Sequence, residues 1–190
     1  MASQPVSHVP PEDYLAFERA AETKHEYIDG EIVAMAGGSP KHGLLALNTA
    51  AQFRLRAAGG SCIPFNSDVR VAVQWDRLIT YPDVFVVCGE VQYTDERRDT
   101  ITNPKVIVEV LSPSTRNYDR GAKSYLYRQL PSLAEYLLIE HDAPEVETYR
   151  RLPNNHWEIE TVRGLDATVR IECLGWDLPL AEIYRDTERL

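Results

Sequence analysis

The chain has 190 residues, of which 44% are hydrophobic and 26% are charged, as in an ordinary globular protein. No apolar run approaches the roughly 20 residues that a membrane helix needs, and residues 1–14 lack the basic and then apolar pattern of a signal peptide. We therefore expect one domain over residues 1–190, located in the cytoplasm and without membrane contact.

The formal net charge of −9 argues against a polyanion-binding protein, because affinity for nucleic acid comes largely from basic groups that meet phosphates. A local basic stripe would still permit such binding against an acidic background. Any single cluster of this kind is more often a solvated face. The candidate stripes are Arg54, Arg56 and Arg70, and Arg116, Arg120, Lys123 and Arg128.

Three cysteines lie far apart in the sequence, at Cys62, Cys88 and Cys173. Their odd number and the lack of CxxC spacing argue against a disulfide framework and against a zinc site. Cys88 follows an apolar run, so we expect a buried thiol there.

The N-terminal third predicts a helix, a hairpin and a second helix. Residues 10–20 place proline and acidic residues in a first helical turn. Residues 25–37 form a hairpin signal around Asp29-Gly30, a pair that favours a tight turn. In residues 39–60 Leu44, Leu47, Ala51 and Leu55 recur at helical spacing before Gly59-Gly60 ends the helix.

The remainder predicts strands interrupted by one helix. Strands are expected in residues 62–73, where Val69, Val71 and Val73 alternate with Asp68 and Arg70, and then in 80–88 and 105–111. A loop and helix follow in 112–130, then a strand in 134–142, a hairpin of 145–151 with 156–162, and a short helix in 179–190. This order predicts an α/β (α+β) fold in which helices pack on a mixed central sheet.

Two of the predicted strands contain an acidic residue among apolar residues. Asp83 opens "DVFVV" and Glu109 interrupts "VIVEVL". An unpaired buried carboxylate is costly, so each acid needs a partner. If the strands are neighbours, the two carboxylates meet on one side of the sheet, and a hard divalent cation such as Mg²⁺ satisfies the pair.

A lysine shares the apolar face of the following helix. Lys123, Leu126, Tyr127 and Leu130 are spaced i, i+3, i+4 and i+7. A lysine on a buried face is uncommon without a partner, so its ammonium is expected to point at Asp83 and Glu109 rather than to extend into solvent. There it would stabilise negative charge on a phosphate or on an attacking water.

The other polar candidates are weaker. Glu26 either reaches the same site or faces water, and Asp68 is a further possible acid. His42 begins a helix, and we interpret it as a capping or packing residue. Taken singly, Asp83, Glu109 or Lys123 can also be part of a purely structural ion pair.

At these residues the sequence resembles the Uma2 family of the PD-(D/E)XK nuclease superfamily. The resemblance runs from about His25 to Arg151 through "HEYIDGEIVAMAGGSPKH", "NSDVRV", "YPDVFVV", "NPKVIVEVLSPSTRNYDRGAKSYLY" and "LPSLAEYLLIEHDAPEVETYRR". It implies a restriction-endonuclease-like fold, metal-dependent phosphodiester hydrolysis and a homodimer.

The resemblance assigns the motif residue by residue. Pro82-Asp83 matches the Pro-Asp of the superfamily, and Glu109 matches its second acid. The plain motif has a lysine two residues later, where this chain has Leu111. In the family the lysine is displaced to the following helix, which implies Lys123.

The sequence thus predicts a metal-dependent nuclease that acts on nucleic acid, with DNA as the expected substrate. Asp83 and Glu109 would hold Mg²⁺ or Mn²⁺, and Lys123 would position the attacking water. One alternative is a catalytically silent dimeric interaction module, which the net charge and the displaced lysine favour. Another is a hydrolase of small phosphate esters, which would have a closed pocket instead of a basic groove.

Overall fold

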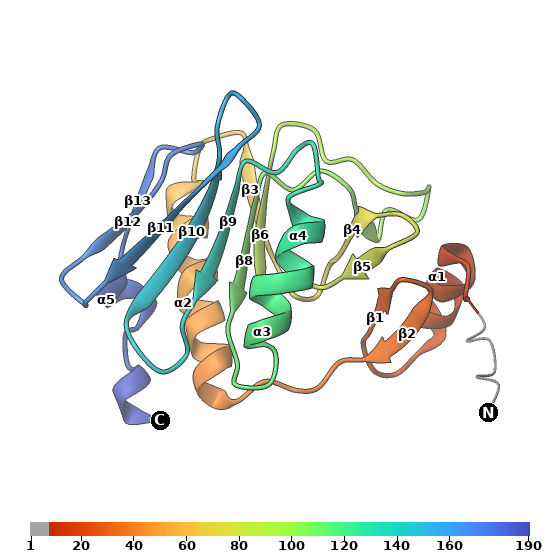
Figure 1. The fold of residues 1–190 in the computed structure, drawn as a ribbon, viewed down its shortest axis with the longest axis horizontal. Coiled ribbons are helices and arrows are strands. Elements are labelled where there is room, and N and C mark those ends of the chain that lie inside the picture. The colour runs from red at the N-terminus through yellow and green to blue at the C-terminus, as the bar shows by residue number, and fades with distance from the viewer. Residues whose placement is uncertain (1–7) are drawn as a thin grey trace.

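The computed structural model describes residues 8–190, which form a six-stranded sheet with helices on both faces and a smaller sheet at one end (Figure 1). Residues 1–7 lie outside the described residues. They are part of the N-terminal segment, residues 1–14, in which the sequence predicts no signal peptide. The helical elements are α1 (Pro11–Ala20), α2 (Pro40–Arg56), α3 (Arg116–Tyr118), the π-helical turn η1 (Asp119–Lys123), α4 (Ser124–Tyr127), α5 (Leu180–Ile183) and the 3₁₀ turn η2 (Thr187–Arg189).

The central sheet has the order β11-β10-β9-β8-β6-β3, in which β8 and β9 are parallel and the other neighbours antiparallel. The predicted mixed central sheet is therefore confirmed. Its strands are β3 (Cys62–Asn66), β6 (Val84–Cys88), β8 (Val106–Val110), β9 (Glu135–Ile139), β10 (Glu145–Arg151) and β11 (Trp157–Arg163).

Side chains of the central strands alternate between two cores, as the pleat requires. Val84 and Val86 face the helix α2, whereas Phe85 and Val87 face the helical segment α3–η1–α4 on the opposite side. Because β8 follows the same alternation, Glu109 shares the α3–η1–α4 side of the sheet with Ile107.

A second sheet, β2-β1-β5-β4-β7, packs against the other side of α3–η1–α4 (Figure 1). It contains β1 (His25–Ile28), β2 (Glu31–Ala34), β4 (Arg70–Gln74), β5 (Leu78–Thr80) and β7 (Thr100–Ile101). The expected hairpin around Asp29-Gly30 is confirmed, since both residues have positive φ in the turn from β1 to β2. A two-stranded sheet of β12 (Thr168–Ile171) and β13 (Trp176–Pro179) completes the fold.

The predicted strand of residues 62–73 is wrong in one respect, because it is two strands in different sheets. A turn after Asn66 sends β3 into the central sheet and β4 into the second sheet. Arg70, which alternates with Val71 and belongs to a candidate basic stripe, is buried, because the second sheet is covered on both faces. Its guanidinium lies 2.7 Å from Asp99 Oδ2.

The helix α2 forms where the periodicity predicts it, but the apolar stripe that predicts it faces solvent. Leu47 is 64% exposed and Leu55 is 71% exposed. The buried face instead carries Leu45, Thr49 and Phe53. The sequence contains two overlapping apolar stripes, and the periodicity alone cannot tell which one the sheet covers.

The expectation that the cysteines form no disulfide framework, with a thiol at Cys88, is wrong. Cys62 and Cys88 form a disulfide between β3 and β6, and only Cys173 is free. The antiparallel register places Cys62 directly opposite Cys88, with 4.0 Å between their Cα atoms, although 26 residues separate them in sequence. The strand β3 is the outer edge of the central sheet and carries Pro64 opposite Val86.

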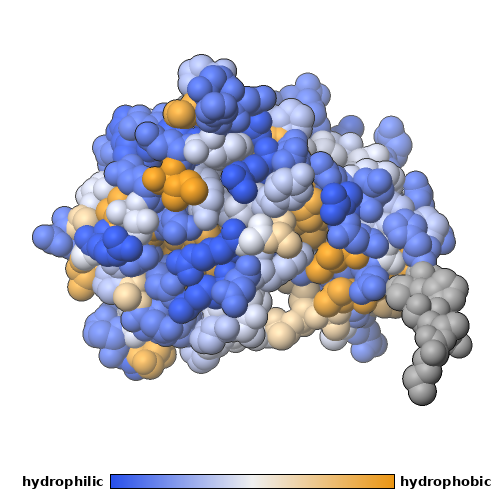
Figure 2. Space-filling view, viewed as in Figure 1, coloured by the Kyte–Doolittle hydropathy of each residue, from blue (hydrophilic) through white to orange (hydrophobic). Residues whose placement is uncertain are grey.

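No helix in residues 8–190 is long and apolar enough to cross a membrane. On the face shown in Figure 2 most residues are hydrophilic, and the apolar residues form separate small groups.

Loss of the disulfide should destabilise the fold without changing its topology. A loop of this length predicts a loss of about 3.5 kcal/mol in the free energy of unfolding for the Cys62→Ser, Cys88→Ser double variant, because the unfolded chain gains conformational freedom. Denaturant unfolding with and without reductant measures the loss. Cys173→Ser is the matched control and should unfold like the parent protein. Equal stability of oxidised and reduced protein would contradict the cross-link.

Candidate active site

The register of β6 and β8 sets the position of the two predicted acids. Val84 pairs with Val108, so Asp83 and Glu109, one residue further along each strand, lie opposite each other. The main-chain N–H of Val110 donates to Asp83 Oδ2 at 2.8 Å, and the N–H of Asp83 lies 3.3 Å from Glu109 Oε2. The predicted neighbourhood of Asp83 and Glu109 is confirmed, although Asp83 directly precedes β6 and only Glu109 lies within its strand.

Lys123 lies between the two sheets, at the end of the turn η1. Its ammonium is 2.9 Å from Glu109 Oε1 in the central sheet and 3.2 Å from Glu26 Oε1 in the second sheet. Only 6% of the residue is exposed. The predicted inward pose of Lys123 is confirmed toward Glu109, but within residues 8–190 its ammonium makes no ion pair with Asp83. Glu26 reaches this cluster, which is one of the two positions that the sequence leaves open.

Further groups complete this buried cluster. The hydroxyl of Tyr127 donates to Glu109 Oε1 at 2.6 Å, and that of Thr80 donates to Glu26 Oε1. Asp119, one turn before Lys123, places Oδ1 3.9 Å from the ammonium. Glu109 Oε1 therefore accepts from both Lys123 and Tyr127, while Oε2 has only the long contact with Asp83 N.

The cluster contains one ammonium group and several carboxylates, and the pKa values of its members reflect this excess of acidic groups. Burial raises the pKa of Glu109 to about 8; the charge of Lys123 opposes that rise, and the nearby Asp83 adds to it. Burial also raises the pKa of Asp119. Although burial alone would lower the pKa of Lys123, the carboxylates of Glu109 and Glu26 outweigh it and hold this pKa well above its usual value.

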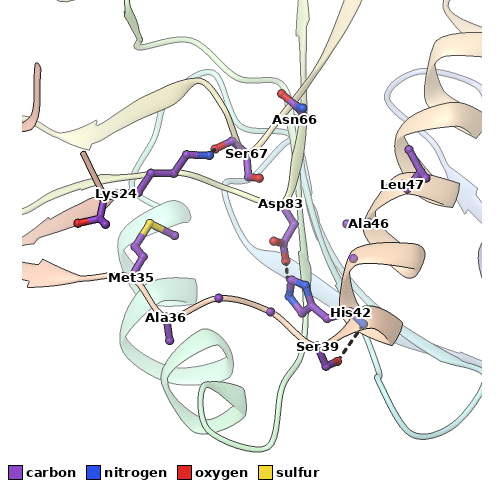
Figure 3. Close-up of a pocket in the computed structure, with 14 residues that line it drawn as sticks. Lys24, Met35, Ala36, Ser39, His42, Ala46, Leu47, Asn66, Ser67 and Asp83 are labelled. Carbon is purple, nitrogen blue, oxygen red and sulfur yellow. Dashed lines mark hydrogen bonds and ion pairs between the residues drawn. The ribbon is translucent and has the colours of Figure 1, made fainter. Parts of the chain in front are cut away.

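His42 belongs to the site, although the sequence predicted only a capping or packing role. Its Nε2 lies 3.2 Å from Asp83 Oδ2, and this contact raises the pKa of His42 (Figure 3). The residue sits in the first turn of α2, where its N–H donates to the N-cap Ser39. A Cβ on Gly38 would lie 2.9 Å from His42 Nδ1, so the glycine gives the ring its space.

Asp68 lies apart from this cluster. Its side chain is 72% exposed and pairs with Lys24 at 2.7 Å. Several members of the candidate basic stripes are also engaged within the protein. Arg116 and Arg120 both pair with Glu140, and Arg70 pairs with Asp99.

The oxygens of Asp83 and Glu109 suit a hard cation. Within residues 8–190, Asp83 Oδ1 accepts no hydrogen bond, and Glu109 Oε2 has only its long contact. No group of three or more His, Cys, Asp or Glu side chains among these residues is arranged to hold a metal ion. A two-carboxylate site fits Mg²⁺ or Mn²⁺, since Mg²⁺ keeps several waters and is commonly bound through one or two carboxylates.

Residues 11–181 match the Uma2 family, described as "Putative restriction endonuclease". Two uncharacterized proteins of Synechocystis sp. are similar to this chain. One is 36% identical over 96% of this chain and 95% of its own length, and the other is 35% identical over 83% and 89%. A crystal structure described as "a putative nuclease belonging to DUF820", from Anabaena variabilis, has a TM-score of 0.74 at 19% identity and covers 93% of this chain and 97% of its own. The restriction-endonuclease-like fold is thereby confirmed.

Glu109 should make the cation-free protein less stable as pH rises. Its folded pKa of about 8 exceeds its usual value of 4.5, so between these values the folded chain holds a proton that the unfolded chain has released. Stability should therefore fall by about 1.4 kcal/mol per pH unit over this window. The measurement is denaturant unfolding in chelator from pH 5 to 8.

The variant Glu109→Gln isolates this effect, because an amide keeps the size of the side chain and cannot ionise. It should match the parent near pH 5 and be more stable near pH 8. Parallel pH profiles for the two proteins would show that Glu109 is already ionised in the folded state.

Gly38→Ala should separate His42 from Asp83, because the added methyl group occupies the space of the ring. The pKa of His42, followed by NMR, should then fall toward its usual value. Gly37→Ala is the matched control, since a Cβ there meets nothing within 4 Å. An unchanged pKa in Gly38→Ala would mean that the ring keeps its contact with Asp83 without this space.

Proposed function

Because this chain belongs to the Uma2 family, we propose that it is a metal-dependent nuclease that hydrolyses phosphodiester bonds, with DNA as the expected substrate. The observation that carries this proposal is the arrangement of two opposed carboxylates, Asp83 and Glu109, with a buried ammonium behind them. A bound cation together with a positive charge near the reacting phosphate is one arrangement that catalyses phosphodiester hydrolysis.

Asp83 and Glu109 would hold Mg²⁺ or Mn²⁺, because each has an oxygen with little other engagement among the described residues. A divalent cation supplies Lewis-acid activation of water and of the scissile phosphate. The contact from Val110 N fixes the orientation of the Asp83 carboxylate. Tyr127 and Lys123 both hold Glu109 Oε1, which leaves Oε2 on the side of Asp83.

Lys123 has two roles in this proposal. Its charge offsets the burial of Glu109, which favours the ionised carboxylate that a cation needs. An ammonium also has three N–H donors, and contacts with Glu109 and Glu26 occupy two of them. The third can position the attacking water or a phosphate oxygen.

His42 acts on Asp83 as a positioning residue. Its contact with Oδ2 and the N–H of Val110 converge on the same carboxylate oxygen, which leaves Oδ1 for the cation. This arrangement holds Asp83 from both the helix α2 and the strand β8.

A silent dimeric interaction module remains the second candidate, and one observation favours it. The stripe of Leu47, Ala51 and Leu55 on α2 is exposed and is not covered by any part of residues 8–190. An apolar surface of this kind is expected where a protein binds a second copy of itself. Such a module would bind a second copy and would not cleave nucleic acid.

Cleavage of single-stranded, duplex and branched DNA, with Mn²⁺ or with chelator, tests the nuclease proposal. We expect cleavage only with the cation, and its loss in Asp83→Asn and Glu109→Gln, because both changes keep side-chain size and remove ligand charge. Lys123→Met should lower turnover and weaken cation binding, because the packed stem remains while the charge that favours ionised Glu109 is lost.

Glu135→Gln is the matched control, since Glu135 is a buried acid in the adjacent strand β9 that accepts from Cys173 N and faces a different part of the molecule. It should cleave at the parent rate. Calorimetry adds a second readout, in which Mn²⁺ binding near pH 7 should release a proton from Glu109. Cation-independent cleavage, or full activity in Asp83→Asn, would contradict the assignment.

A further inference from the structure

A recess of about 610 Å³ opens beside Asp83, and this volume lies in the range of about 300–1,000 Å³ that small ligands occupy (Figure 3). One wall is the segment of residues 35–39 that leads into α2, with the first turns of that helix. The other wall is the turn after β3. Asp83 and His42 lie between these walls, so a group in the recess is next to the proposed cation site.

Two apolar side chains flank the recess. Met35 projects from the segment before α2, and Leu47 projects from the second turn of the helix (Figure 3). Leu47 is 64% exposed, so its surface is available to a ligand. A groove that only held a phosphate backbone would need no apolar lining, whereas the face of a nucleobase does.

The cations of the recess are already paired. Lys24 binds Asp68 Oδ1 at 2.7 Å and the carbonyl oxygen of Ser67 at 2.8 Å, and His42 binds Asp83. With a net charge of −9 as well, phosphate contacts would contribute little to affinity. Binding here must therefore come mainly from contacts with the base.

Polar groups for a base edge are also present. The main-chain groups of Gly37 and Gly38 make no hydrogen bond with any described residue, and both glycines line the recess. Gly37 and Gly38 are exposed, and nothing lies within 4 Å of the position that a Cβ on Gly37 would take. Ser67 and Asn66 add polar side chains on the opposite wall.

We propose that this recess receives one unpaired nucleobase adjacent to the cleaved phosphodiester, so that the substrate class is single-stranded or locally unpaired nucleic acid. The inference rests on the nuclease function proposed above. A base in an intact duplex is stacked and paired, and it must leave the stack before it can enter such a site.

The test measures binding of one fluorescent oligonucleotide, single-stranded or annealed to its complement, by anisotropy in chelator. Single-stranded binding should be at least about tenfold tighter, since unpairing a base costs a few kcal/mol. It should also depend only weakly on salt, because few phosphates are contacted.

Met35→Ala and Leu47→Ala should each weaken single-stranded binding by about fivefold, because each removes apolar contact with the base. Leu55→Ala is the matched control. It lies on the same helix with 71% exposure but outside the recess, and it should bind like the parent. The cleavage rate with Mn²⁺ should follow the same order among the variants.

Each outcome separates the two proposals. Preferred single-stranded binding that Leu47→Ala weakens, without any cleavage, supports the recess and rejects the nuclease. Cleavage of duplex and single strand at equal rates, unaffected by Met35→Ala and Leu47→Ala, overturns the recess proposal and leaves the nuclease intact. Absence of binding to either oligonucleotide overturns the recess proposal too.

Discussion

The ammonium of Lys123 is the charge on which the interior of this protein depends. It lies between two sheets and contacts Glu109 in one and Glu26 in the other. Without it, several carboxylates would face one another in an apolar interior, and breaking such a buried pair costs about 3–5 kcal/mol. The same contact therefore packs the sheets against α3–η1–α4 and keeps Glu109 available as a ligand. Stability and the proposed chemistry both rest on one side chain.

The main features of the site follow from short-range patterns. Asp83 and Glu109 are conspicuous because each interrupts or opens an apolar strand, and Lys123 because it shares a helical face with Leu126 and Tyr127. These patterns depend only on the periods of strand and helix. The central sheet could be predicted for the same reason.

The features that could not be predicted from the sequence depend on pairing between distant segments. The contact of His42 with Asp83 requires the start of α2 to meet the start of β6, and the bond of Cys62 to Cys88 requires the register of two strands 26 residues apart. Which apolar stripe of α2 is buried could not be predicted for a related reason, since both stripes have helical spacing. One sequence feature could have indicated the position of His42. The Gly-Gly pair before Ser39 allows a side chain to lie close to the main chain, and the ring of His42 lies close to Gly38.

Pro64 has a consequence for how copies of this protein can meet. It lies in β3, the strand that closes one edge of the central sheet, and it has no N–H to donate. Proline is tolerated in sheets where its nitrogen faces away from the ladder, so the missing donor interrupts the free edge. A strand from another molecule would find an incomplete row of partners there. This edge of the central sheet is thus protected against edge-to-edge aggregation. A strand from another molecule could extend the central sheet only at the opposite edge, beside β11.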